Sequence, residues 1–95
     1  MATFHFSRRA QGDLRAIVRY IHQDNPVAAL TLVQEITERC RLYAATPLIG
    51  RDRSEDFGEG VRGFPFGNYI VLYRPITDGI VVIRIIHAAQ NIRVL

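Results

Sequence analysis

Residues 69–87 read YIVLYRPITDGIVVIRIIH, and this stretch decides the fold. Two apolar runs, Tyr69–Arg74 and Ile80–His87, flank the pair Asp78-Gly79, which is typical of a tight turn between antiparallel strands. Because both runs are apolar on both faces, we expect them to be central strands of a sheet. Both are far shorter than the roughly 20 apolar residues that a membrane-spanning helix needs.

Two shorter strands are expected elsewhere in the chain. Val61–Phe64 precedes the first apolar run and is joined to it by Pro65–Asn68, which has the Pro, Gly and Asn residues of a hairpin turn. Ala2–Phe6 alternates polar and apolar residues, as a half-buried strand does. Leu48–Gly60 is rich in glycine and charged residues, and we expect it to be a loop.

The segment between the expected strands Ala2–Phe6 and Val61–Phe64 predicts two helices. Ser7 suits the N-cap of a helix that runs to about Gln23, and Asn25 and Pro26 suit the cap and first position of a second that runs to about Ala45. A connection this short makes an antiparallel helical hairpin. The expected buried stripes are Ala10, Leu14, Ile17, Val18 and Ile21 on the first helix, opposite a solvent face of Arg8, Gln11, Arg15, Arg19 and His22, and Ala29, Leu32 or Val33, Ile36, Cys40 and Tyr43 on the second.

The order strand, helix, helix, strand, strand, strand predicts an α+β two-layer sandwich. We expect a single domain over residues 1–95, with the N-terminal helical hairpin packed on one face of a small, mostly antiparallel sheet. The other face should stay partly open, because no further element is predicted to cover it. Such an open face is a natural place for a partner.

Composition is that of an ordinary globular protein, with 48% hydrophobic and 22% charged residues. The net charge is +3, and all 12 basic residues are arginines, whose planar forks suit carboxylates and phosphates. The balance allows an anionic partner, either nucleic acid or an acidic protein segment. Cys40 is the single cysteine, which excludes an internal disulfide, and we assign it to core packing. No secretory signal is recognisable, so the cytoplasm is the expected location.

Motifs of the common enzyme classes are absent from the sequence, including the glycine-rich dinucleotide and phosphate loops, the zinc-protease helix and the serine-hydrolase elbow. The three histidines, His5, His22 and His87, are too scattered to predict a metal site. We therefore expect no metal and no cofactor.

Three arginines fall on or beside the expected strands: Arg62, Arg74 and Arg84. Arg84 interrupts an apolar strand and must reach water, a carboxylate or a ligand, because an unpaired buried charge is costly. One interpretation is an internal salt bridge; the other is that Arg84 and Arg62 form a basic patch on the open face. The two-residue period of a strand places Arg84 and His87 on opposite faces unless a bulge intervenes.

A series of short motifs runs in order along nearly the whole chain. They are Ser7-x-x-Ala10-x-x-Asp13-Leu14-x-x-Ile17-x-x-Tyr20-Ile21, Asn25-Pro26-x-Ala28-Ala29, Thr46-Pro47-x-x-Gly50-Arg51, Gly60-Val61-Arg62-Gly63-Phe64-Pro65, Asn68-Tyr69-x-x-x-Tyr73-Arg74 and Ile83-x-x-x-His87. In this order they resemble the RelE/ParE superfamily of toxins from bacterial type II toxin–antitoxin pairs, and the ParE branch more closely. That family's fold agrees with the one predicted from periodicity.

The resemblance implies a cytoplasmic toxin that inhibits growth by binding DNA gyrase and trapping it on cleaved DNA, a role associated with plasmid stabilisation. It also implies a hetero-oligomer with a cognate antitoxin, which has an N-terminal DNA-binding dimer and an acidic C-terminal segment that wraps the toxin. The residues expected to bind partners are Arg62, Tyr73, Arg74, Arg84 and His87.

The alternative is the RelE branch, whose members cut messenger RNA on the ribosome. Arg62, Arg84 and His87 would then supply the phosphate-binding cations and the acid or base of a nuclease. The absence of lysine and the small net charge weigh against docking on ribosomal RNA. Related toxins often have a basic residue about three positions after His87, where this chain has Gln90. A third possibility is an orphan toxin that binds its antitoxin and tunes repression of their shared promoter.

Overall fold

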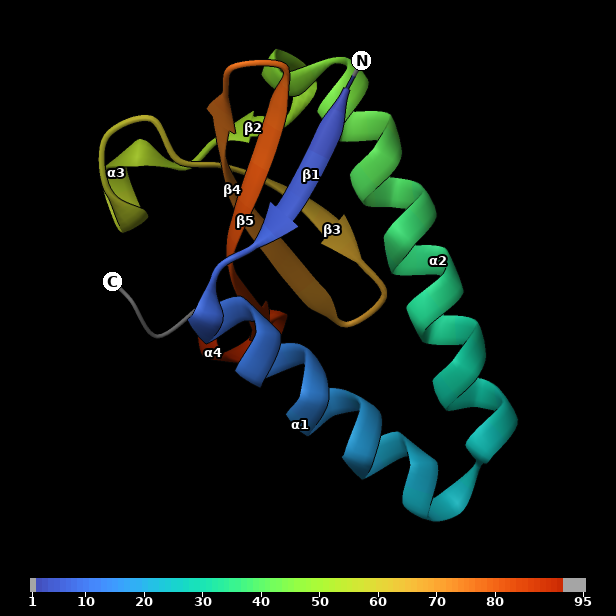
Figure 1. The fold of residues 1–95 in the computed structure, drawn as a ribbon. Helices are drawn as coiled ribbons and strands as arrows, with labels where there is room; N and C mark the ends of the chain where they lie inside the picture. The colour runs from blue at the N-terminus through green and yellow to red at the C-terminus, as the bar shows by residue number, and fades with distance from the viewer. Residues whose placement is uncertain (1, 92–95) are drawn as a thin grey trace.

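The computed structural model describes residues 2–91, in which the chain forms one five-stranded mixed sheet (Figure 1). The strand order is β1-β5-β4-β3-β2, with β1 parallel to β5 and every other pair antiparallel. The elements along the chain are β1 (Thr3–Phe6), α1 (Arg8–Asp24), α2 (Pro26–Ala45), the 3-10 turn η1 (Pro47–Ile49), β2 (Arg51–Asp52), α3 (Ser54–Phe57), β3 (Arg62–Phe66), β4 (Tyr69–Ile76), β5 (Gly79–His87) and α4 (Ala88–Asn91).

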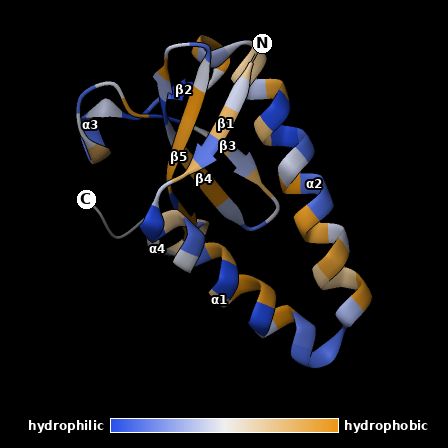
Figure 2. Ribbon diagram, viewed as in Figure 1, coloured by the Kyte–Doolittle hydropathy of each residue, from blue (hydrophilic) through white to orange (hydrophobic). Residues whose placement is uncertain are grey.

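This architecture confirms the predicted α+β fold, including the helical hairpin and the central places of β4 and β5. In Figure 1, α1 and α2 lie on one side of the sheet and α3 lies on the other. Figure 2 shows hydrophobic residues along β5 and alternating hydrophobic and hydrophilic bands along α1, as expected of a buried strand and an amphipathic helix. None of the helices in residues 2–91 is long and apolar enough to cross a membrane.

Local chemistry sets the boundaries of the helical hairpin. The Ser7 side chain caps α1 by accepting a hydrogen bond from the Ala10 N–H at 3.1 Å. The Asn25 side chain caps α2 in the same way, accepting from the Ala28 N–H at 3.0 Å, and Pro26 takes the first helical position. Each cap satisfies a backbone donor that has no partner within its helix, so both helices begin where the sequence predicts.

The core lies between the hairpin and the inner face of the sheet. Ile36 and Cys40 of α2 are buried, as predicted, and Tyr43 stacks on Phe64 of β3 with ring centroids 4.0 Å apart. Burial raises the pKa of the Cys40 thiol to about 12, so the thiol stays protonated at neutral pH and acts as a small apolar group. The other buried core residues are Ala10, Ala44, Val71, Tyr73, Ile80, Val82 and Ile85.

The outer face of the sheet is less open than the sequence predicted, and residues 48–60 are not simply a loop. β2 pairs with β3, and the Arg53 guanidinium lies 5.3 Å from the centre of the Phe57 ring on α3. The side chains of Arg53 and Leu72 both lie against Gly63, and Leu72 is fully buried although it faces away from α1 and α2. The expectation was wrong here because these contacts are tertiary and leave no periodic signal in so short a segment.

A pair of glycine substitutions tests the close pairing of β1 with β5. A methyl group on Gly79 would overlap the Thr3 carbonyl oxygen where β1 pairs with β5, so Gly79→Ala should lower the free energy of unfolding by about 2–4 kcal/mol. Gly12, in the middle of α1, has no neighbouring atom within 4 Å of the same position. Gly12→Ala should therefore raise stability by about 1 kcal/mol. Urea denaturation measures both, and a Gly79→Ala variant of unchanged stability would contradict the described pairing.

Candidate functional site

The register of β4 and β5 decides which faces the predicted site residues occupy. Arg84 lies opposite Leu72, and His87 lies opposite Tyr69. Residues directly opposite one another share a face, and successive residues alternate. Arg84 therefore lies on the outer face with Leu72, and His87 lies on the helix-covered face. The bulge in this pair lies before Arg84, at Ile83, so the predicted separation of Arg84 and His87 is confirmed.

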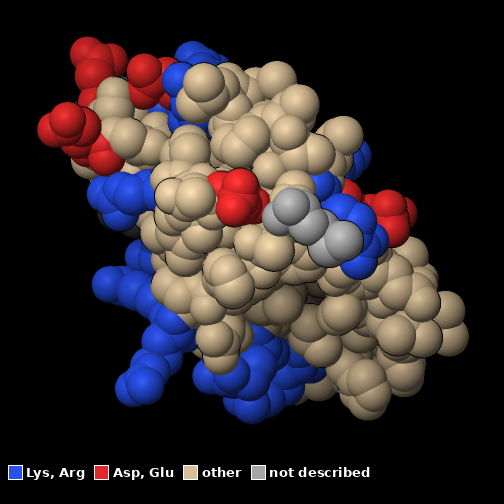
Figure 3. All heavy atoms as spheres, turned by 45° about the horizontal axis from the view of Figure 1, so that its top comes forward, with Lys and Arg blue, Asp and Glu red and all other residues tan. Residues whose placement is uncertain are grey.

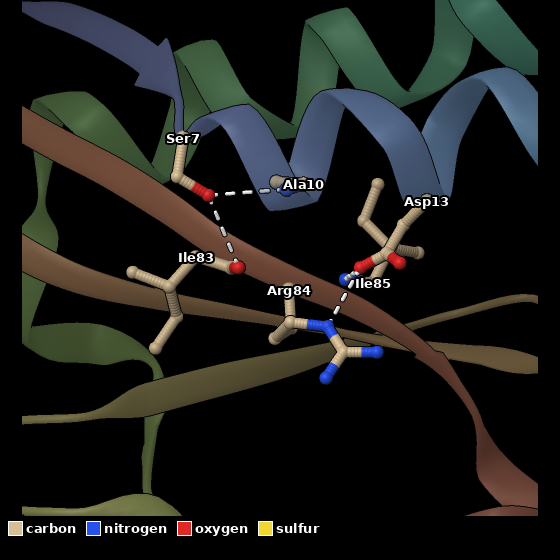
Figure 4. Close-up of polar contacts among 6 residues, drawn as sticks. All are labelled: Ser7, Ala10, Asp13, Ile83, Arg84 and Ile85. Carbon is tan, nitrogen blue, oxygen red and sulfur yellow. Dashed lines mark hydrogen bonds and ion pairs between the residues drawn. The ribbon is translucent and has the colours of Figure 1, made fainter.

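Where β1 ends, the residue that begins α1 takes over the hydrogen bonding to that edge of β5. The last pair between the two strands is Phe6 with Val82, and Ser7 follows at once. The Ser7 N–H donates to the Val82 carbonyl at 2.9 Å, and its hydroxyl donates to the Ile83 carbonyl at 3.2 Å (Figure 4). Ser7 thus caps α1 and continues the bonding of β5 with one side chain.

Asp13 of α1 hydrogen-bonds to the same edge of β5 further along the strand. Its Oδ2 accepts from the Ile85 backbone N–H at 2.9 Å and from Arg84 Nε at 2.9 Å (Figure 4). The two side chains are partly buried, with 34% of Arg84 and 19% of Asp13 exposed. Of the two interpretations of Arg84, the internal salt bridge is therefore the one that the structure contains.

Arg62 and Tyr73 together hold η1 against the sheet. The Arg62 guanidinium donates to the Leu48 carbonyl at 3.1 Å and to the Gly50 carbonyl at 2.8 Å. The Tyr73 hydroxyl donates to the Pro47 carbonyl at 2.6 Å and accepts from the Gly50 N–H at 3.0 Å. Burial raises the pKa of Tyr73, and its side chain has no exposed surface to offer a partner in this fold.

Arg74 and His87 are exposed. Arg74 Nε donates to the Glu59 carbonyl at 3.3 Å. The His87 ring meets the Tyr69 ring edge-on, with centroids 5.4 Å apart, and its Nδ1 accepts from the Ala89 N–H at 3.2 Å. Gln90 lies beyond the described side chains.

The structure does not bring the predicted site residues together. Arg62 lies opposite Tyr73, whose side chain belongs to the helix-covered core, whereas Arg84 lies on the outer face. The second interpretation, that Arg62 and Arg84 form one basic patch on the open face, is therefore wrong. The physical reason is the period of the strands, which separates these arginines once their register is known.

The cationic surface lies on α1 instead. Within residues 2–91, five arginines make no hydrogen bond or ion pair with the chain, and four of them lie on this helix. Arg8, Arg15 and Arg19 share one line of the helix with His22, because spacings of seven, four and three residues return to the same side. We call these four residues the α1 stripe; all are exposed, and Figure 3 shows arginines gathered over α1. The unpaired arginines are Arg8, Arg9, Arg15, Arg19 and Arg51.

An apolar groove of about 480 Å³ runs beside the α1 stripe. Leu14 and Val18 of α1 and Val33 of α2 supply its apolar wall, and Arg15, Arg19, His22 and Gln23 complete the lining. We call it the hairpin groove. The sequence contained the signal for this surface, in the periodic basic residues of the first helix, but they were assigned only to a solvent-exposed face.

The family model described as the ParE toxin of type II toxin–antitoxin system, parDE, matches residues 4–92. The chain belongs to this family. It is thus a type II toxin of the ParE/RelE superfamily, as its motifs indicated.

Relatives of this ParE-family toxin match over most of their length. Toxin ParE3 of Caulobacter vibrioides is 32% identical over 90 residues, which cover 90% of this chain and 86% of the relative. Toxin RelE3 of the same organism is 28% identical over 91 residues, covering 96% and 99%. A solved structure, the chromosomal ParDE TA system from P. aeruginosa, matches with a TM-score of 0.74 at 26% identity, covering 92% of this chain and 96% of that one.

No group of three or more histidine, cysteine, aspartate or glutamate side chains in residues 2–91 of this ParE-family toxin could hold a metal ion. The polar side chains around β5 are instead committed to one another and to the backbone. What the described surface offers is a row of unpaired cations beside an apolar groove.

Asp13 accepts hydrogen bonds from both the Ile85 N–H and Arg84, so its loss should cost more stability than the loss of Arg84. Asp13→Ala leaves the Ile85 N–H and Arg84 without their acceptor and should lower the free energy of unfolding by about 2 kcal/mol. Arg84→Gln removes only a partly exposed ion pair and should cost less than about 1 kcal/mol. Chemical denaturation of both variants measures the difference. Equal losses, or a larger loss for Arg84→Gln, would show that Asp13 does not serve mainly as the acceptor for the β5 edge.

Proposed function

We propose that this toxin inhibits DNA gyrase by binding, holds the enzyme on cleaved DNA, and is neutralised by a cognate antitoxin. The observation that carries the proposal is the separation of Arg62, Arg84 and His87, the residues that a nuclease of this superfamily would have recruited here. Membership of the ParE toxin family supports the same assignment.

Cleavage of RNA needs cations at the phosphate and an acid or base beside the reacting oxygens. In this chain the Arg62 guanidinium is bonded to two backbone carbonyls, and Arg84 is paired with Asp13 on the opposite face of the sheet. His87 shares a face with Arg62 but is set against Tyr69 at the end of β5. Inhibition by binding requires no such cluster, so the geometry favours it over catalysis.

An antitoxin partner is supported by the ParDE TA system, a solved structure similar in fold. The arrangement proposed is a hetero-oligomer in which the antitoxin contributes an N-terminal DNA-binding dimer and an acidic C-terminal segment. Such a segment suits a chain of net charge +3 whose unpaired cations are all arginines.

Ribosome-dependent cleavage of messenger RNA is the second candidate. One specific observation favours keeping it, which is the similarity to Toxin RelE3 over 96% of this chain. In that case Arg62, Arg84 and His87 would have to be rearranged on the ribosome before they could act together.

A paired experiment separates the two functions. The purified toxin is added to a gyrase supercoiling assay and, in parallel, to a translating lysate whose messenger RNA is mapped by primer extension. We expect loss of supercoiling, accumulation of cleaved DNA and no codon-linked cuts. Cuts in the messenger RNA together with unchanged supercoiling would replace the gyrase assignment with the nuclease.

His87→Ala sharpens the comparison. Removing a general acid or base should slow RNA cleavage by a nuclease by about a hundredfold or more, whereas a gyrase inhibitor cleaves no RNA with or without the imidazole. His5→Ala, on the outer face of β1, is a matched control for the loss of an exposed imidazole. Codon-linked cleavage by the wild-type toxin that is lost in His87→Ala alone, with its thermal unfolding unchanged, would contradict inhibition by binding.

A further inference from the structure

We infer that the α1 stripe binds the phosphate backbone of duplex DNA, without regard to base sequence. The inference goes beyond the proposed function, in which the toxin binds gyrase and an antitoxin, and it rests on that function only for the choice of DNA over RNA. A gyrase inhibitor that holds the enzyme on cleaved DNA acts where a duplex is within reach. Direct contact between the toxin and this duplex adds to that hold.

The first argument is the sign of the charges along the stripe. Arg8, Arg15 and Arg19 are exposed, and none makes a hydrogen bond or ion pair within residues 2–91. Of the two carboxylates of α1, Asp13 is bonded at the β5 edge and Asp24 lies about 160° around the helix from Arg8. In the view of Figure 3, basic side chains at the lower left stand apart from the acidic ones, which gather near α3. The local field is therefore positive, although the net charge of the chain is only +3.

The second argument is Gly12, which interrupts the stripe one turn after Arg8 and one turn before Arg15. A glycine inside a helix lowers its stability. Nothing in the fold requires this one, because its φ is not positive and a methyl group at its position would have no neighbouring atom within 4 Å. The missing side chain leaves bare helix backbone between two arginines, where a bulky phosphodiester can approach closely.

The start of α1 is also unfavourable for the helix itself. Arg8 and Arg9 occupy its first two positions, and its first turn has no acidic residue. Cations there oppose the helix dipole, whose N-terminal end favours acids. Thus α1 has arginines at its start and a glycine within it, both at some cost in stability, and a polyanion bound along this side explains both.

The stripe suits phosphates better than it suits a protein. Small or polar residues such as Gly12, Ala16 and Gln23 flank the arginines on the side away from the hairpin groove, and a protein interface depends on buried apolar anchors. Phosphates need only cations, and the arginine fork binds two phosphate oxygens at once. Unpaired bases would need aromatic side chains to stack on, but Tyr20, the only Phe, Tyr or Trp of α1, lies about 120° around the helix from Arg8. A duplex is therefore favoured over a single strand.

The spacing of the stripe sets the size of the contact. From Arg8 to Arg19 it extends about 17 Å along α1, at about 1.5 Å per residue. One strand of DNA presents a phosphate about every 3.4 Å along the duplex axis, so three arginines can reach about three phosphates. Neutralising about three phosphates predicts a slope of about −3 for the logarithm of the association constant against the logarithm of salt concentration. The dissociation constant at physiological salt should lie between about 1 and 100 µM, as is usual for binding that ignores sequence.

Two double variants of equal net charge test the contact. Arg15→Gln with Arg19→Gln removes two cations of the stripe, whereas Arg41→Gln with Arg51→Gln removes two exposed arginines of α2 and β2. Binding of the toxin alone to a fluorescein-labelled DNA duplex is measured by fluorescence anisotropy at several salt concentrations. We expect the first variant to bind at least about tenfold more weakly, with a salt slope shallower by about 2, and the second to stay within about threefold of wild type.

Gly12→Leu tests the close approach separately from the charge. Gln34→Leu adds the same exposed side chain in the middle of α2 and is the matched control. We expect Gly12→Leu to unfold at the same temperature as wild type or higher, yet to bind DNA at least about fivefold more weakly, and Gln34→Leu to bind as wild type does. Unchanged DNA binding by Gly12→Leu would contradict the close approach on which the inference depends.

Equal binding by the two double variants, or no binding of DNA by the wild-type toxin at low salt, would overturn the inference. Tighter binding of a duplex RNA of the same sequence would overturn the choice of DNA. Displacement of the DNA by a polyglutamate peptide at a lower concentration of charge would overturn it in favour of an acidic protein. None of these results depends on gyrase, whose inhibition is tested by the supercoiling assay, so failure of the inference and failure of the proposed function are read separately.

Discussion

Completion of the second edge of β5 is the interaction on which the rest of the structure depends. One edge pairs with β4 along its length, whereas β1 covers only the first half of the other. Where this pairing ends, the N-cap residue Ser7 hydrogen-bonds to the carbonyls of Val82 and Ile83, and Asp13 of α1 accepts from the Ile85 N–H. Exposed strand edges invite pairing with other chains, and here a helix start removes that risk while it fixes the direction of α1.

The same arrangement divides the arginines into two classes. Arg62 and Arg84 serve the fold, because each is bonded to a carbonyl or carboxylate that positions a neighbouring segment. Arg8, Arg15 and Arg19 make no hydrogen bond or ion pair within residues 2–91, and they are exposed on a helix that Ser7 and Asp13 hold in place. In this ParE-family toxin, four of the five unpaired arginines of residues 2–91 thus lie on α1, and the fifth is Arg51 of β2. A toxin that acted only by binding another macromolecule would need an exposed surface of this kind. It would not need a catalytic pocket in which acid and base groups converge.

Much of the fold was predictable because its signals are local. The helix starts were predicted from the capping residues Ser7 and Asn25 and from Pro26. The β4–β5 turn was predicted from Asp78-Gly79. The cover over Leu72 was not predictable, because it depends on Arg53 lying against Gly63 of β3, which is a tertiary contact. Likewise, Asp13 and Arg84 are 71 residues apart in the sequence, and only the docking of α1 on β5 brings them together. The motifs were sufficient to recognise the family, but they did not reveal which arginines are free.

The central claim is that this toxin acts by binding and does not turn over a substrate. The most direct measurement counts events per toxin molecule, by titrating the protein into a fixed amount of gyrase with plasmid DNA and into a translating lysate. The account predicts inhibition that rises with the ratio of toxin to gyrase and levels off when gyrase is saturated, with no RNA fragments in the lysate. RNA fragments that outnumber the toxin molecules, with gyrase still active, would contradict it.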